Sequence, residues 1–160
     1  MKRTVVTLLA FFVCMCSSQL FAAEKPVQLS LVDPIQLFTS DESITGLRLN
    51  LIYGKNADVT GLDFGLGNHV TGKMQGIQYG FVNLAGDGGA GLQWGWVNVD
   101  KGGTFTGFQY GIYNETNQMV GLQLGLVNFA QSTNGLQLGL INIIKSGGWF
   151  PVFPIINGSL

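Results

Sequence analysis

Side chains able to carry out chemistry are few in this sequence and far apart along it. After residue 24 there is one histidine, His69, and no cysteine, since Cys14 and Cys16 both precede that point. A Ser-His-Asp triad would have to be built around His69, and no matched partner stands near it. Thiolate and imidazole metal sites lack ligands. We expect His69 to lie solvated in the turn that follows Asn68, and we predict that the protein is not an enzyme.

Two further patterns resemble sites but lack the context that such sites need. The acidic residues Asp33, Asp41, Glu42 and Asp58 gather loosely in the sequence, without the ligand spacing of a calcium loop. The segment 86–91 reads Gly-x-Gly-x-x-Gly, but a dinucleotide fingerprint must open a helix, and a strand pattern follows here. We therefore predict no catalytic, cofactor-binding or metal-binding residues and no cofactor.

Four aromatic residues stand out because a ligand could stack on them. They are Tyr79, Trp94, Trp96 and Tyr110. Stacking on a sugar is one use of such rings, and packing at a membrane interface or in a core is the other. We favour packing, with ligand stacking as the alternative.

These aromatic residues belong to a repeat that must position them. Its consensus is Gly, apolar, Gln, apolar, Gly, apolar, apolar, Asn, and successive copies start 14 to 16 residues apart. The copies begin at Gly46, Gly61, Gly76, Gly91, Gly107, Gly121 and Gly135. A fixed period of this kind is the signature of a repeat architecture and has to be recognised before any other pattern.

The repeat alternates in the manner of a β-strand. Positions two, four and six are large and apolar in every copy, and side chains two apart share one face of a strand. The opposite face carries Gly, Gln and Gly. Two glycines per repeat would weaken a helix by about 1 kcal/mol each. We therefore predict one strand per repeat, joined by turns rich in Gly, Asn and Asp, in a single β-repeat domain over residues 24–160.

Two all-β architectures fit one strand every 14 to 16 residues. The first, which we favour, is an antiparallel up-and-down sheet or small β-barrel of about eight strands, with segment 149–160 supplying the last. Its apolar face would meet lipid, which accepts any apolar size, including the change from Leu to Trp at position four. The alternative is a parallel β-solenoid with the apolar residues as its core. That arrangement would stack the recurring asparagines into a ladder: Asn68, Asn83, Asn98, Asn114, Asn128 and Asn142.

The N-terminal segment has the pattern of an export signal. Lys2 and Arg3 precede an apolar run, and Ala22 and Ala23 offer a cleavage site, so we predict a signal peptide over residues 1–23. The remaining chain holds six Lys or Arg and nine Asp or Glu, a net charge of −3. Without a basic patch, binding to nucleic acid is excluded.

The phrase Gly-Leu-Gln-Leu-Gly-Leu-Val-Asn at residues 121–128 resembles a group of uncharacterised bacterial exported surface-repeat proteins. The tail at residues 149–157 resembles the ending of such proteins. This resemblance implies a location in the bacterial envelope and brings no known activity. Segments 78–85 and 123–130 are also similar to the Gln-x-Gly-x-x-Asn-x-Ala core of curli fibre subunits, although the repeated Ser and the second Gln are missing.

These observations predict a non-catalytic protein of the bacterial cell envelope with a structural role. We expect it to be exported to the outer membrane or cell surface, with the periplasm as the alternative, and to have membrane lipid as its partner. The alternative function is that of a soluble β-solenoid interaction or adhesion module.

Overall fold

A computed structural model describes residues 25–159, and the predicted signal peptide lies outside this range. The described chain is all-β, which confirms the predicted class. Its strands are β1 (Val27–Val32), β2 (Ile35–Gln36), β3 (Ile44–Asn56), β4 (Val59–Val70), β5 (Met74–Tyr79), β6 (Val82–Ala85), β7 (Gly89–Trp94), β8 (Val97–Ser146) and β9 (Val152–Ser159). None of the described residues belongs to a helix that is long and apolar enough to cross a membrane.

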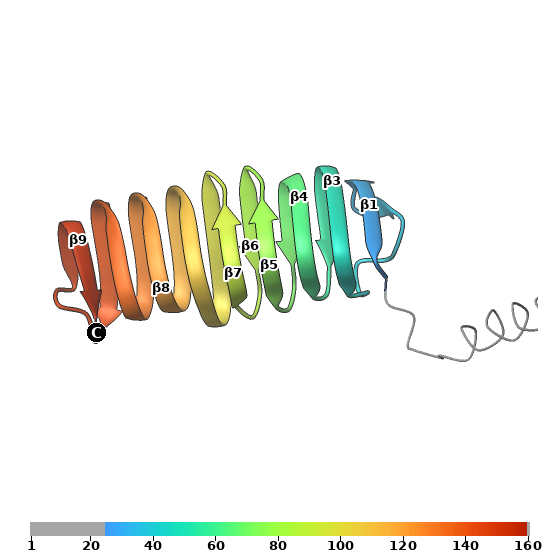
Figure 1. Ribbon diagram of the computed structural model, residues 1–160. Helices are drawn as coiled ribbons and strands as arrows, with labels where there is room; N and C mark the ends of the chain where they lie inside the picture. Colours follow the sequence, from blue (N-terminus) through green and yellow to red (C-terminus); the bar gives the residue numbers. More distant parts are fainter. Residues whose placement is uncertain (1–24, 160) are drawn as a thin grey trace, which may run out of the picture.

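The repeats stack in parallel as successive turns of a β-solenoid. Gly46 pairs with Gly61, Gly61 with Gly76, and Gly76 with Gly91, so each repeat glycine lies on the equivalent glycine of the preceding turn. Strand β8 winds on through the remaining repeats, and Figure 1 shows the coils following one another from β1 at one end to β9 at the other. The sequence period is thus the length of one turn of the coil.

The favoured antiparallel sheet or eight-stranded barrel is therefore wrong, and the solenoid alternative has the correct strand direction. The prediction failed because it assumed that the large apolar side chains must fill a solenoid's core, which tolerates differences in side-chain size poorly. The structure instead places Gln and Asn inside and the apolar positions outside. On the outside, a change from Leu to Trp disturbs no packing.

Each turn contains a corner that the sequence analysis did not foresee. In one turn, β5 ends at Tyr79 and β6 begins at Val82, so Gly80 lies where the strand bends. A Cβ on Gly80 would collide with the Gly65 carbonyl and with the amide of Asn68. The first glycine of the repeat is constrained differently, since Gly76 has a φ of 123°, which is a strained value for any other residue.

An Asn ladder, formed by Asn50 and the asparagines at repeat position eight, supports the corners from inside. Each side-chain amide donates to the next asparagine, as in Asn83 Nδ2 to Asn98 Oδ1 at 2.8 Å. The same nitrogen also donates to a backbone carbonyl at the following corner, that of Trp94 at 3.1 Å. The predicted asparagine ladder is confirmed, and its physical role is to satisfy carbonyls where the strand breaks.

A Gln ladder runs beside the Asn ladder with the opposite polarity. Gln137 donates to Gln123 at 2.7 Å and Gln123 to Gln109 at 2.8 Å, so donation runs toward the N-terminus, whereas the asparagines donate toward the C-terminus. The dipoles of the two amide rows therefore oppose each other. Each ladder leaves one acceptor at its open end, Asn50 Oδ1 and Gln137 Oε1, without a hydrogen bond from the described residues.

The two ends of the solenoid are capped in different ways. Strand β1 stacks in parallel on β3, but the chain then turns at Asp33 and Pro34, and β2 runs antiparallel to β1. At the other end, β9 pairs antiparallel with the last turn of β8. The predicted C-terminal strand is thus present, as a cap on the solenoid and not as a barrel strand.

Candidate functional site

The most extensive exposed feature is an outer apolar face, which we define as repeat positions two, four and six. It forms three rows that follow the solenoid axis, and none of its members is charged. Side chains from every part of the coil are exposed, including Leu51 at 67%, Trp96 at 61% and Leu140 at 68%. Soluble monomers rarely expose a continuous apolar patch of more than a few hundred Å². This face therefore needs a functional explanation.

Aromatic rings gather in the middle of the outer apolar face. At position four, the ring of Tyr79 lies 5.7 Å from that of Trp94, which lies 5.5 Å from Tyr110, both in edge-to-face contact. At position six, Phe81 and Trp96 meet edge to face at 4.8 Å. The structure thus brings together the four aromatic residues singled out in the sequence, and places them on the exterior.

The outer apolar face is hollowed between the rows at positions four and six. An N-terminal groove has a volume of about 890 Å³. A hollow of about 120 Å³ adjoins it at Leu66 and Tyr79, and one of about 450 Å³ follows at Trp94 and Trp96. The three share lining residues in succession, so they form a furrow along the solenoid.

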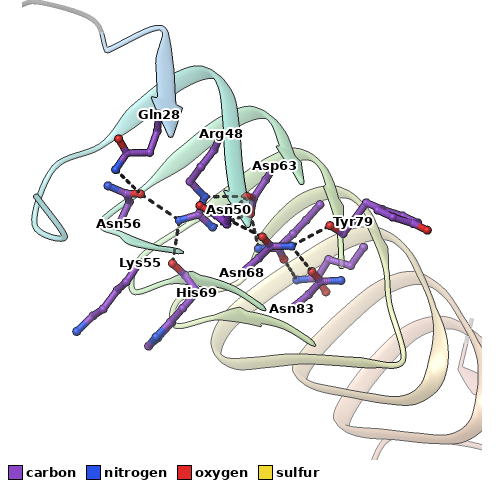
Figure 2. Close-up of polar contacts among 12 residues, drawn as sticks. Gln28, Arg48, Asn50, Lys55, Asn56, Asp63, Asn68, His69, Tyr79 and Asn83 are labelled. Carbon is purple, nitrogen blue, oxygen red and sulfur yellow. Dashed lines mark hydrogen bonds and ion pairs between the residues drawn. The ribbon is translucent and has the colours of Figure 1, made fainter. Parts of the chain in front are cut away.

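The interior contains a charged pair that replaces glutamine in the first two repeats. Arg48 and Asp63 occupy position three, and both are completely buried. Arg48 donates to Asp63 through Nε at 2.7 Å and Nη2 at 2.6 Å, as Figure 2 shows. Gln78, the last donor of the Gln ladder, also donates to Asp63 at 2.8 Å. The aspartate therefore terminates the ladder as an acceptor, and the arginine neutralises it.

A second buried carboxyl group, that of Asp100, lies beside the Gln ladder. Gln109 Nε2 donates to it at 2.7 Å, but no cationic group forms an ion pair with it among residues 25–159. Burial raises the pKa of Asp100 to about 7, and the hydrogen bonds from Gln93 and Gln109 only partly offset this. The carboxyl group is therefore partly protonated at neutral pH.

The prediction that His69 lies in a turn is wrong, because the residue lies within β4. Its Nδ1 lies 2.6 Å from the hydroxyl of Tyr53. Burial lowers the pKa of His69, with a further contribution from Lys55, and burial also raises the pKa of Tyr53. Both groups are therefore neutral at pH 7, and a hydrogen bond joins the tyrosine hydroxyl to the imidazole.

The acidic residues are held apart by other partners. Glu42 pairs with Lys25, and Asp58 accepts from the backbone of Lys73 at 2.7 Å. No group of three potential ligands of the His, Cys, Asp or Glu type converges within the described residues. The Gly-x-Gly-x-x-Gly segment leads into β7, which begins at Gly89, and thus opens a strand and not a helix.

These features define the class of protein as a parallel β-solenoid whose interior combines amide ladders with buried apolar clusters and whose exterior carries an apolar face. No model of a known protein family matches the chain, and neither a curated protein nor a solved structure matches it.

Sequence reasoning missed the N-terminal groove and the buried charges. The signal for the pair was present, because Arg48 and Asp63 stand at the repeat position that otherwise holds glutamine. Asp100 aligns with Ala85 in the adjacent turn, a position that is buried throughout. The groove had no such signal, since it depends on the unforeseen reversal of the chain after β1.

Proposed function

We propose that this chain is a non-catalytic β-solenoid interaction module of the bacterial cell envelope, and that the surface it binds is lipid. The observation that carries this proposal is the outer apolar face. Three rows of large apolar side chains run along the coil without a charged member. Lipid accepts apolar side chains of any size and favours Trp and Tyr near its borders.

The polar interior supports peripheral attachment. The hydrogen bonds of the Gln and Asn ladders are already made inside the coil, so the outer apolar face does not have to be buried within the protein for those amides to be satisfied. Exposing the face to water costs about 25 cal/mol per Å² of apolar surface. Contact with a membrane removes this cost and leaves the coil intact.

The proposed location in the envelope rests on sequence. The predicted signal peptide over residues 1–23 and the resemblance to exported surface-repeat proteins both support export. The outer membrane or cell surface is the location we favour, and the periplasm is the alternative. The absence of catalytic function is proposed because only one histidine and no cysteine follow residue 24, and no matched catalytic set is recognisable around that histidine.

Neutral vesicles provide the test. We expect the protein (residues 24–160) to float with phosphatidylcholine vesicles in a density gradient, independently of salt, because the face carries no charge to be screened. The double variant Trp96→Glu/Leu126→Glu should bind at least a hundredfold more weakly. Each of these side chains is half exposed or more, and burying a side chain of this size contributes about 1.5–3 kcal/mol.

The matched control adds the same two charges elsewhere on β8, as Gln118→Glu/Gln131→Glu. These two side chains are exposed and lie outside the outer apolar face. The control should float like the unmodified protein. A protein that stays at the bottom of the gradient, or equal losses in the two double variants, would show that the apolar rows do not bind lipid.

A soluble interaction or adhesion module is the second candidate. The exposed aromatic cluster of Tyr79, Trp94 and Tyr110 favours it, because Trp and Tyr are enriched among the residues that dominate protein interfaces. Failure to float, combined with pull-down of a protein partner that the Trp96→Glu/Leu126→Glu variant no longer captures, would replace lipid by protein as the partner.

A further inference from the structure

The N-terminal groove differs from the other hollows of the outer apolar face in volume and in construction. One wall comes from the repeats, through residues such as Leu49, Leu51 and Phe64. The other comes from the β1–β2 hairpin, which contributes Leu29, Leu31, Ile35 and Leu37. Ile35 and Leu37 are 62% and 60% exposed, so they do not stabilise the core. The hairpin thus widens the furrow into an open groove of about 890 Å³.

The lining selects an uncharged and apolar occupant. No residue that lines the groove is charged. Of its polar members, Ser30 donates to the Tyr53 carbonyl at 3.0 Å, and Gln36 donates to the Phe38 carbonyl at 2.7 Å. A carboxylate or ammonium in the groove would find no counter-ion among the lining residues. The volume lies within the range of about 300–1,000 Å³ that is usual for small-molecule sites.

The position of the groove indicates where such an occupant comes from. The groove shares Leu66 and Tyr79 with the next hollow, so it opens along the outer apolar face and not into the interior. A molecule that reaches it from a bilayer passes over apolar side chains all the way. A flexible hydrocarbon chain can follow such a groove, whereas a flat membrane or a flat protein surface cannot enter it.

We propose that the N-terminal groove binds one acyl chain of a phospholipid whose head group stays outside. A phospholipid fits better than a free fatty acid, because the lining has no cation to pair with a carboxylate. This proposal rests on the proposed lipid-binding function and gives it a specific site: the outer apolar face contacts the membrane, and the groove holds one lipid by its tail.

The chain offers a matched pair of variants for the test. Leu51 and Leu140 both occupy position six of their repeats, and their side chains are 67% and 68% exposed. Leu51 lines the groove, whereas Leu140 lies at the far end of the same row. Neither change removes a core contact, so both Leu51→Glu and Leu140→Glu should fold.

Dodecylphosphocholine below its micelle concentration is the probe, since it presents one hydrocarbon chain and a phosphocholine head without a bilayer. We expect saturable binding of one molecule per protein by calorimetry. Leu51→Glu should weaken it at least tenfold, and Leu140→Glu by less than twofold. Dodecanoate, the free fatty acid of the same length, should bind more weakly than dodecylphosphocholine.

Absence of saturation, or equal losses in the two variants, would overturn the groove proposal. Tighter binding of dodecanoate would overturn the choice of phospholipid. Vesicle flotation separates this proposal from the proposed function, because both Leu51→Glu and Leu140→Glu lie on the outer apolar face and should weaken flotation alike. Saturable probe binding without flotation would leave the groove as a lipid site and refute attachment to a membrane.

Discussion

Replacing Arg48 by methionine should lower the free energy of unfolding by about 3–5 kcal/mol, the usual cost of leaving one member of a buried ion pair without its partner. Arg48 and Asp63 are both fully buried, and two hydrogen bonds of 2.6 and 2.7 Å join them. Without the guanidinium, the Asp63 carboxylate keeps only amide donors such as Gln78. Urea denaturation followed by circular dichroism measures the loss.

The repeat itself supplies the matched control. Glutamine is the residue at position three in the later turns, so the double variant Arg48→Gln/Asp63→Gln extends the Gln ladder by two members. We expect this variant to recover most of the stability lost in Arg48→Met. If Arg48→Gln alone is as stable as the unmodified protein, the pair does not hold the end of the ladder as proposed.

The stability of the protein should fall as pH rises from about 4 to about 7, because of Asp100. Its pKa is about 7 in the folded state against an ordinary 3.8. Between these values the folded protein binds a proton that the unfolded chain has released, so a rise in pH favours unfolding. Each pKa unit corresponds to 1.36 kcal/mol, and the full effect is therefore roughly 4 kcal/mol.

Asp100→Asn isolates this effect. Asparagine resembles the protonated carboxyl group in shape and does not titrate, so the variant should lose this pH dependence and be more stable than the unmodified protein at pH 8. His69 contributes with the opposite sign, since its lowered pKa makes stability rise with pH, but it is present in both proteins and cancels in the difference. Urea midpoints at pH 4.5, 6 and 8 provide the measurement. Equal curves for the two proteins would contradict the assignment.

Much of the local structure was readable from the repeat. Alternation at positions two, four and six predicted extended strands and a continuous apolar face, and both are present. The solenoid alternative also predicted the ladder through Asn83 and Asn98, which the hydrogen bond of 2.8 Å confirms. These features depend on side-chain spacing along one strand, which the sequence gives directly.

The favoured interpretation of the sequence nevertheless predicted the wrong strand direction. A spacing of about 15 residues fits an antiparallel hairpin as well as one coil of a parallel solenoid, because both place a turn between successive strands. Contacts between neighbouring repeats decide between the two strand directions. Gly76 must lie against the Gly61 carbonyl, and Asn83 must reach the Trp94 carbonyl of the following turn. In each case parallel stacking brings the partner into contact.

By itself, therefore, the sequence determined the period, the strands and the row of asparagines. Only the tertiary structure decided which face lies inside. Strand alternation shows which residues share a face, but not which face points into the coil. Apolar residues ordinarily point inward. Here the inner face belongs to Gln and Asn, since stacked amides satisfy one another from turn to turn and small glycines let the coils approach. The large side chains at positions two, four and six point outward and form the exposed face that we propose binds lipid, while buried apolar clusters that include Met74 and Phe105 fill other parts of the interior.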